Sequence, residues 1–223
     1  MNKEKSKHTW IYRNSLSIVF IVLFIATLFA QAYMGWKVHN EELNDGGLTP
    51  LSFIEYTKSG HFISATFENF ESEFLQMALY VVLTISLRQI GSAESKKLEG
   101  KEPVDREPVP GPDAPWPVRK GGWILKLYQH SLSLTFLLLF LISWGMHFYG
   151  SFQDHNIERI MAGKPRISVP DFVLQADFWF ETFQNWQSEF LSVASIVILT
   201  IFLRQKGSPE SKPVDTPYLE TED

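Results

Sequence analysis

Two stretches of this sequence place carboxylates at the start of an apolar segment and an arginine at its end. Residues 67–75 have the sequence FENFESEFL and lead through an apolar run to Arg88. Residues 183–191 have the sequence FQNWQSEFL and lead through a second apolar run to Arg204. Acids at the edge of a membrane segment can bind an ion or a proton, or they can cap a helix, whose first amides carry partial positive charge.

Polar side chains continue along both segments at three- or four-residue steps, which places them on one face of each helix. Unsatisfied polar groups are costly at membrane depth, so we expect these two faces to point into a helix bundle. Gln31 and His147, on two further apolar segments, are expected to approach the same acidic ends. The residues predicted for this polar site are Glu73, Glu189, Gln31, His147, Gln76, Asn69 and Asn185.

Two interpretations of these polar residues stay open. In the first, they cap helices and hydrogen-bond the helices to one another. In the second, Glu73 and Glu189 form a site for an ion, a proton or a small polar solute. In either case Arg88 and Arg204 are expected to anchor the ends of their segments at the cytoplasmic surface.

A histidine and a glutamate recur three residues apart in two polar connections. His39 precedes Glu42, and His155 precedes Glu158, so each pair lies on one face of a helix. Two such pairs could together bind a divalent metal ion. The alternative is a solvated surface, because no third ligand is evident. His61 is interpreted as a surface residue, since the position 116 residues later is an aspartate.

Four apolar segments are each expected to cross a membrane as a helix, at about 15–36, 68–88, 127–150 and 184–204. At about 1.5 Å per residue, some 20 residues cross a hydrocarbon core of about 30 Å. The second and fourth segments have only 14 uncharged residues between glutamate and arginine, so their acidic ends should lie near the membrane surface. A cleaved signal peptide is the alternative for the first segment, but its apolar run is too long. The predicted fold class is an all-α membrane protein.

The two halves of the sequence are similar at an offset of 116 residues. About 33 of the 82 positions from Ser15 to Lys96 are identical to the positions 116 residues later, with no gap. We therefore predict two parallel repeats, each a helical hairpin, at 1–96 and 123–206. A Pro-rich cytoplasmic linker (97–122) should join them, and a disordered tail (207–223) should follow. Each extracytoplasmic loop is expected to contain a short interfacial helix, opening at the motifs Ser52-x-x-Glu55 and Ser168-x-x-Asp171.

Charge and composition restrict the location and the function classes. Lysine and arginine gather at the N-terminus, in the linker and after the second repeat, so both termini and the linker are expected in the cytoplasm. The chain has no cysteine and no motif of a phosphate loop or a zinc protease, so neither an enzyme nor a cofactor is expected. The net charge of −5 without a basic cluster argues against a nucleic-acid partner. The expected partners are the lipid bilayer, further copies of the chain or other membrane proteins.

Several motifs resemble those of an uncharacterised bacterial family, domain of unknown function 6766. They are residues 12–17, 67–75 and 87–96, each with its second copy. The resemblance implies a small multi-pass protein of the bacterial inner membrane with two tandem copies, and it supplies no activity or ligand. The predicted role is therefore a structural or accessory component of that membrane. A channel or transporter using Glu73 and Glu189, and a divalent-metal-binding membrane protein, are the alternatives.

Overall fold

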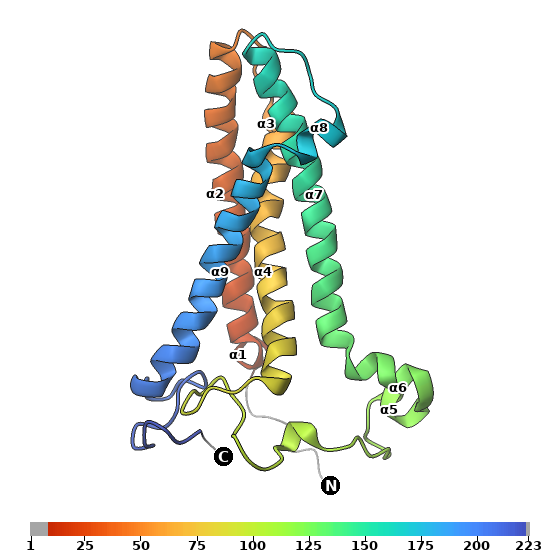
Figure 1. The fold of residues 1–223 in the computed structure, drawn as a ribbon, viewed down its shortest axis with the longest axis vertical. Helices are drawn as coiled ribbons and strands as arrows, with labels where there is room; N and C mark the ends of the chain where they lie inside the picture. The colour runs from red at the N-terminus through yellow and green to blue at the C-terminus, as the bar shows by residue number, and fades with distance from the viewer. Residues whose placement is uncertain (1–8, 222–223) are drawn as a thin grey trace. The chain divides into compact units, whose positions relative to one another are not determined.

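The computed structural model describes residues 9–221, and it contains no strand within them, which confirms the all-α prediction. The long helices are α2 (Ser15–Asp45), α4 (Gly60–Ser86), α7 (Ser131–Met161) and α9 (Ala176–Phe202). The short ones are α1 (Trp10–Arg13), α3 (Phe53–Tyr56), the 3₁₀ helix η1 (Pro103–Asp105), α5 (Trp116–Lys120), α6 (Gly122–Gln129) and α8 (Val169–Val173). Helices α5 and α6 follow α4 in the chain and precede α7. They lie beside one another (Figure 1).

The bounds of the long helices recur at the offset seen in the sequence. Helix α7 begins and ends 116 residues after α2, and α9 begins and ends 116 residues after α4. The short helices α3 and α8 also begin 116 residues apart. Similar sequence is thus accompanied by equal helix bounds, while the arrangement of two parallel hairpins stays a prediction.

The chain forms two compact units, and each unit takes residues from both halves of the sequence. The first unit consists of Met1–Thr66 and Phe148–Phe172, and the second consists of Phe67–His147 and Val173–Asp223. Helix α4 begins in the first unit and continues in the second, and α7 begins in the second and continues in the first. Each unit is described by itself below.

Among residues 9–221, three helices are long and apolar enough to cross a membrane, namely α2, α7 and α9. This finding corrects the prediction of four spans, because α4, which contains the predicted span 68–88, does not qualify. Helix α4 has the same length as α9, but Glu68, Glu71 and Glu73 in its first half lower its mean hydropathy. Large apolar side chains cover the surface of α2, as lipid contact requires. Three such helices indicate a membrane protein.

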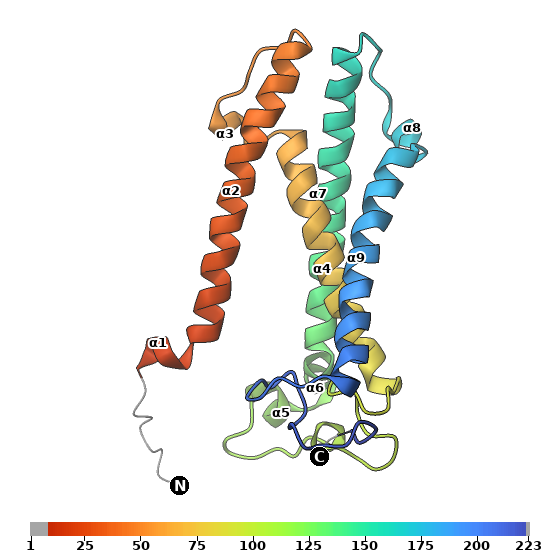
Figure 2. The ribbon, with the colours of Figure 1, turned by 90° about the vertical axis from the view of Figure 1, so that its left-hand side faces the viewer.

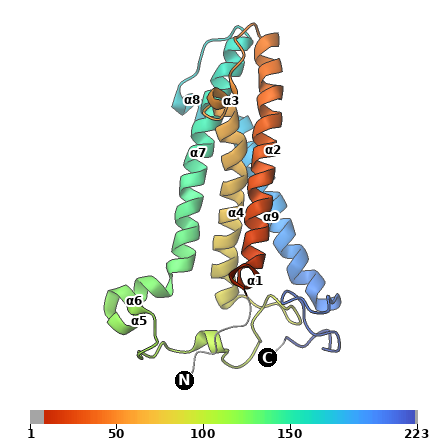
Figure 3. The ribbon, with the colours of Figure 1, turned by 180° about the vertical axis from the view of Figure 1, so that it is seen from behind.

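In the first unit, the second half of α2 packs against α3 and the segment before it (Figure 3). The Trp36 indole donates a hydrogen bond to the carbonyl of Leu51 at 2.7 Å. The side chain of Asn40 pairs with both the amide and the carbonyl of Leu51, at 2.7 and 2.8 Å. The ring of Phe53 contacts the rings of Trp36 and Phe29, at 5.9 and 6.2 Å between centroids. Helix α2 ends at Asp45, directly before Gly46 and Gly47.

The predicted capping motifs are present at the two short helices. The Glu55 amide donates to the Ser52 hydroxyl at 3.4 Å, and the Ser52 amide donates to the Glu55 carboxylate at 2.8 Å, which completes a capping box. The hydrogen bonds from Ser52 hold the pKa of the Glu55 carboxyl below its ordinary value. At α8, the Asp171 amide donates to the Ser168 hydroxyl at 3.5 Å.

In the second unit, α4, α7 and α9 pack together, as Figures 1 and 2 show from two sides. The rings of Phe74 and Phe136 join α4 to α7 at 6.5 Å between centroids. The rings of Phe140 and Trp186 join α7 to α9 at 6.1 Å. Helices α4 and α9 are joined by hydrogen bonds of Gln76, given below.

Arg88 and Arg204 close the C-terminal ends of α4 and α9 in the same way. The Nη1 atom of Arg88 donates to the carbonyls of Ile85 and Leu87 at 3.1 and 2.9 Å. The Nη1 atom of Arg204 donates to the two corresponding carbonyls, at 3.2 and 2.9 Å. A cation at this position pairs with carbonyls that have no partner inside the helix. Their predicted location at the cytoplasmic surface stays a prediction.

The tail after α9 forms turns around one lysine as far as the structure describes it. Lys212 is 1% exposed. Its ammonium group donates to the carbonyls of Pro217, Tyr218 and Glu220, at 3.2, 3.0 and 2.8 Å. These bonds satisfy the three hydrogens of the ammonium group.

Candidate functional site

A buried histidine and a buried glutamate face each other in the second unit. His147 of α7 and Glu71 of α4 both have fully buried side chains. The Nδ1 atom of His147 lies 3.0 Å from the Oε2 atom of Glu71. An ionised carboxylate only accepts hydrogen bonds, so Nδ1 carries the hydrogen of this bond. In the neutral imidazole, Nε2 is then the atom with the free lone pair.

The second oxygen of Glu71 is paired as well. The Trp186 indole of α9 donates a hydrogen bond to Oε1 of Glu71 at 3.2 Å. Glu71 is therefore held from two sides, by a histidine on α7 and by a tryptophan on α9. These bonds fix the carboxylate, and with it the orientation of the imidazole ring.

The other nitrogen of His147 faces two more carboxylates. Its Nε2 atom is buried and has no hydrogen-bond partner. The nearest oxygens of Glu68 and Glu181 lie 3.8 and 3.7 Å from it, which is too far for a hydrogen bond. The side chains of Glu68 and Glu181 are 25% and 43% exposed, so both carboxylates contact solvent beside the buried ring. The Asn185 side chain donates a hydrogen bond to the backbone carbonyl of Glu181 at 3.1 Å.

We call Glu68, Glu71, His147 and Glu181 the histidine–carboxylate cluster. One ligand atom each from Glu68, His147 and Glu181 lies within 4.8 Å of the other two. A metal bound to imidazole and carboxylate has bonds of about 2.0–2.2 Å, which puts two ligand atoms about 3.4 Å apart in a tetrahedron. The observed separations of 3.7 and 3.8 Å are close to that value. Glu71 stands where an outer carboxylate orients a metal-binding histidine.

Two of the residues predicted for the polar site, His147 and Asn185, lie in or beside this cluster. The carboxylate that pairs with His147 is Glu71, whereas Glu73 is exposed. Gln76 donates to the backbone carbonyl of Glu189 at 3.3 Å, so it joins α4 to α9. The hypothesis of an ion site around Glu73 and Glu189 stays a prediction.

Two further predicted residues, Gln31 and Asn69, make contacts of a structural kind. Gln31, in the first unit, donates to the backbone carbonyl of Ala65 at 3.2 Å. Asn69, in the second unit, is exposed, and its carbonyl accepts a hydrogen bond from the Ser72 hydroxyl at 2.9 Å. The first contact joins α2 to α4, and the second joins neighbouring turns of α4.

The prediction missed Glu68, Glu71 and Glu181. A signal for them exists where the two halves of the sequence differ in charge. At an offset of 116 residues, His147 corresponds to Gln31, and Glu181 corresponds to Ala65. At both positions the second half of the sequence has an ionisable residue where the first half has a neutral one. The glutamines that correspond to Glu68 and Glu71 are exposed.

The predicted metal pairs lie in the first unit and differ from one another. The Nδ1 atom of His39 is 3.5 Å from Glu42, and the Nδ1 atom of His155 is 4.0 Å from Glu158. The imidazole of His61 is stacked on His39 with ring centroids 4.6 Å apart. His61 is half-buried, which corrects its interpretation as a surface residue. Within residues 9–221, His155 and Glu158 belong to no group of three ligands.

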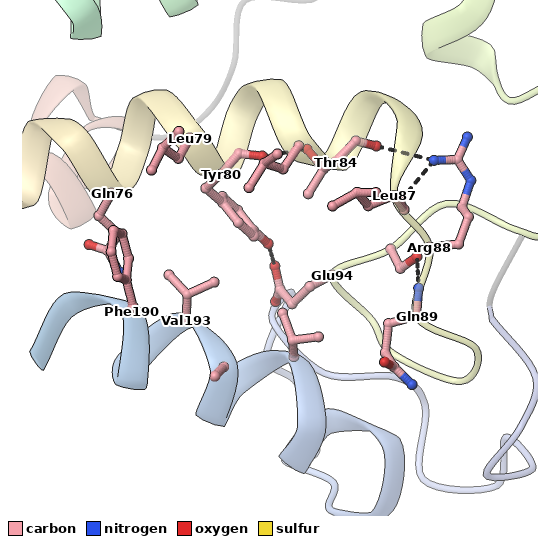
Figure 4. Close-up of a pocket in the computed structure, with 14 residues that line it drawn as sticks. Gln76, Leu79, Tyr80, Thr84, Leu87, Arg88, Gln89, Glu94, Phe190 and Val193 are labelled. Atoms are coloured by element: carbon pink, nitrogen blue, oxygen red, sulfur yellow. Dashed lines mark hydrogen bonds between the residues drawn. The ribbon is translucent and has the colours of Figure 1, made fainter. Parts of the chain in front are cut away.

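A mostly apolar groove of about 350 Å³ lies between α4 and α9 (Figure 4). Leu79, Phe190 and Val193 are among the side chains that line it. At its polar end, the Tyr80 hydroxyl donates a hydrogen bond to Glu94. Such a lining is suited to acyl chains, and the groove contains none of the residues of the cluster.

No curated protein and no solved structure matches the chain. One protein family matches residues 7–223 as a single domain, so that two tandem copies are not shown. The description of the family supplies neither an activity nor a ligand. Because the match covers nearly the whole sequence, the chain belongs to the family described as a domain of unknown function (DUF6766).

Proposed function

We propose that the protein is an integral membrane protein that binds a divalent metal ion between Glu68, His147 and Glu181. The observation that carries the proposal is the Nε2 atom of His147, buried without a hydrogen-bond partner and facing two carboxylates. A buried polar atom without a partner costs about 1–3 kcal/mol, and a bound ion would remove that cost.

The charges of the cluster support a cation. Three carboxylates surround one imidazole, so the ionised cluster has an excess of negative charge. Charges away from water are costly unless they are paired or coordinate a metal. A divalent ion supplies two positive charges at the place where Glu68 and Glu181 converge, while Glu71 keeps the hydrogen bonds from His147 and Trp186.

The ligand types favour a first-row transition metal such as Zn²⁺. Imidazole nitrogen suits Zn²⁺, Fe²⁺ and Ni²⁺, whereas Mg²⁺ and Ca²⁺ prefer oxygen ligands alone. The ligands come from α4, α7 and α9, so the ion would link three helices. This joins the structural role and the metal-binding role that the sequence left as alternatives. Three protein ligands leave one position open for water or a solute.

We further propose a bacterial inner membrane as the location, with the linker and the tail in the cytoplasm. The support is the positive charge in or directly before these two segments, at Lys96, Lys97, Lys101, Arg106, Arg119, Lys120, Arg204, Lys206 and Lys212. Helices α7 and α9 connect the two segments, so two crossings return the chain to the same side. Reporter fusions in the linker and at the C-terminus test this orientation, and a periplasmic signal from either would overturn it.

The metal proposal is tested with purified, metal-depleted protein in detergent micelles. Co²⁺ is added and its visible absorption is followed, since tetrahedral nitrogen and oxygen ligands give an intense band. We expect His147→Ala and Glu181→Gln each to remove one equivalent of bound ion. Glu73→Gln is the matched control, because Glu73 lies on α4 near the cluster but is exposed.

The rival interpretation is a cluster that only holds helices together. In that case, none of the cluster variants changes the number of bound ions, and Zn²⁺ does not raise the melting temperature of the native protein. Glu181→Gln keeps the test valid if His147→Ala fails to fold, because Glu181 is partly exposed and does not pair with Glu71.

A further inference from the structure

We propose a second site for a divalent transition metal, in the first unit, with His39, Glu42 and His61 as its ligands. It goes beyond the proposed function because it lies in the other unit and shares no residue with the histidine–carboxylate cluster. We call these three residues the two-histidine site. One ligand atom from each lies within 4.8 Å of the other two.

His39 supplies a buried and unpartnered nitrogen. The residue is 4% exposed, and its Nδ1 atom has no hydrogen-bond partner. The nearest charged oxygen is Oε2 of Glu42, at 3.5 Å, one helical turn further along α2. The Glu42 side chain is 51% exposed, so an ion can reach the nitrogen from the side of Glu42.

His61 is held in place by a buried tyrosine. The Tyr56 hydroxyl lies 3.0 Å from Nδ1 of His61, which leaves Nε2 of that ring for an ion. Tyr56 is 1% exposed. Gly35 makes room for this hydroxyl, since a Cβ atom at that position would clash with it. A tyrosine that orients a histidine acts as the outer partner of a metal ligand.

The stacking of the two rings favours the neutral form that metals require. The ring planes of His39 and His61 are inclined by 28°, with centroids 4.6 Å apart. Two imidazolium cations would repel each other at this distance, so at least one ring is neutral. A neutral imidazole has the lone pair that coordinates a metal.

The ligand set indicates the class of ion. Two imidazoles and one carboxylate suit Zn²⁺ and related ions better than Mg²⁺ or Ca²⁺. Bonds of about 2.0–2.2 Å place two ligand atoms about 3.4 Å apart, so binding would draw the three side chains together by about 1 Å. Glu42 can make this movement because it is exposed. The alternative is that the histidines only stack to join α2 to the first turn of α4.

The test counts Zn²⁺ ions per chain, using metal-depleted full-length protein in detergent micelles with calorimetry and elemental analysis. We expect two equivalents for the native protein. We expect one equivalent for His61→Ala and for Glu42→Gln. Because Glu42 is exposed, Glu42→Gln keeps the fold and remains informative if His61→Ala does not fold. Circular dichroism verifies the helix content of each variant.

His155→Ala is the matched control. His155 lies in the same unit, and its Nε2 atom is buried without a partner. Its Nδ1 atom lies 4.0 Å from Glu158, but among residues 9–221 no third ligand joins them. We expect this variant to keep both equivalents. The proposal is overturned if Glu42→Gln binds as many ions as the native protein, or if His155→Ala loses one.

The same experiment separates this site from the histidine–carboxylate cluster. If His147→Ala changes nothing while Glu42→Gln removes all bound Zn²⁺, the two-histidine site is supported and the proposed function fails. If His147→Ala removes all of it and Glu42→Gln removes none, the proposed function is supported and the two-histidine site fails.

Discussion

The two units use corresponding positions of the sequence for different interactions. In the first unit, Gln31 of α2 donates a neutral hydrogen bond to the Ala65 carbonyl at 3.2 Å. At positions 116 residues later, in the second unit, His147 of α7 faces the Glu181 carboxylate at 3.7 Å. Both pairs join a long helix to the start of the next one. The same backbone arrangement thus supports a structural contact in one unit and an ionisable cluster in the other.

At the histidines of the first unit, it is the first half of the sequence, rather than the second, that supplies the additional ligand. His39 packs against the ring of Tyr56 at 5.9 Å, and His155, 116 residues later, packs against Phe172 at 5.4 Å. Phe172 has no hydroxyl to orient another ring, and the residue that corresponds to His61 is an aspartate. Both histidines therefore pack against an aromatic ring, but only His39 has a second histidine beside it. Departures from the repeat, rather than the repeat itself, therefore mark both proposed sites.

The largest effect that tests this comparison is expected at Glu71. Glu71→Ala leaves the Nδ1 atom of His147 and the indole hydrogen of Trp186 buried without a partner, which should reduce the free energy of unfolding by about 3–5 kcal/mol. Gln187, 116 residues later, is exposed. Gln187→Ala should change the free energy of unfolding by less than about 0.5 kcal/mol. Denaturation in micelles, followed by circular dichroism, measures both. Equal effects would contradict the asymmetry between the two positions.

A smaller effect is expected when the second unit receives the pair found in the first. The double substitution His147→Gln with Glu181→Ala places a glutamine amide near Glu71, where it can still donate a hydrogen bond. The loss of unfolding free energy should then be about 1–3 kcal/mol, below that of Glu71→Ala. Binding of one Co²⁺ equivalent should be lost completely. Retention of that equivalent would place the ion elsewhere.

Local features of the fold followed from the sequence, whereas the partners of the acids did not. The capping box of Ser52 depends on residues close in the chain, so the spacing of Ser52 and Glu55 was sufficient to predict it. The buried face of α4 depends on three helices at once. Residues two apart on a helix point about 200° from one another, so the choice between Glu71 and Glu73 decides which carboxylate is inside. The polar stripe favoured Glu73, and the structure buries Glu71.

The prediction of four spans failed because of the same acids. Length alone suited α4 for a membrane, since it equals that of α9. Its first half, however, contains Glu68, Glu71 and Glu73, and α4 does not reach the hydropathy of an independent span. In the second unit, Glu71 pairs with His147 and Trp186. Hydropathy describes a helix by itself, and the stability of this one depends on side chains of α7 and α9.

The capping motifs offer a comparison in which the two positions should behave alike. Ser52→Ala and Ser168→Ala each remove a hydroxyl that accepts from the backbone amide three residues later, at 3.4 and 3.5 Å. Each should lower the free energy of unfolding by about 1 kcal/mol. Thermal denaturation of the two variants side by side measures this. A difference larger than about 1 kcal/mol between them would show that the corresponding loops are not equivalent.

The smallest effect concerns the titration of Glu55. The folded-state pKa of Glu55 is lowered by its hydrogen bonds with Ser52, so its contribution to stability is present above the unfolded-state pKa and is lost as the pH falls through the folded value. NMR of carboxyl-labelled protein should show the Glu55 midpoint below its ordinary value, and Ser52→Ala should raise it. Ser168→Ala is the control and should leave it unchanged. If Ser52→Ala does not move the midpoint, the carboxylate is stabilised by the positive end of α3 itself rather than by the serine.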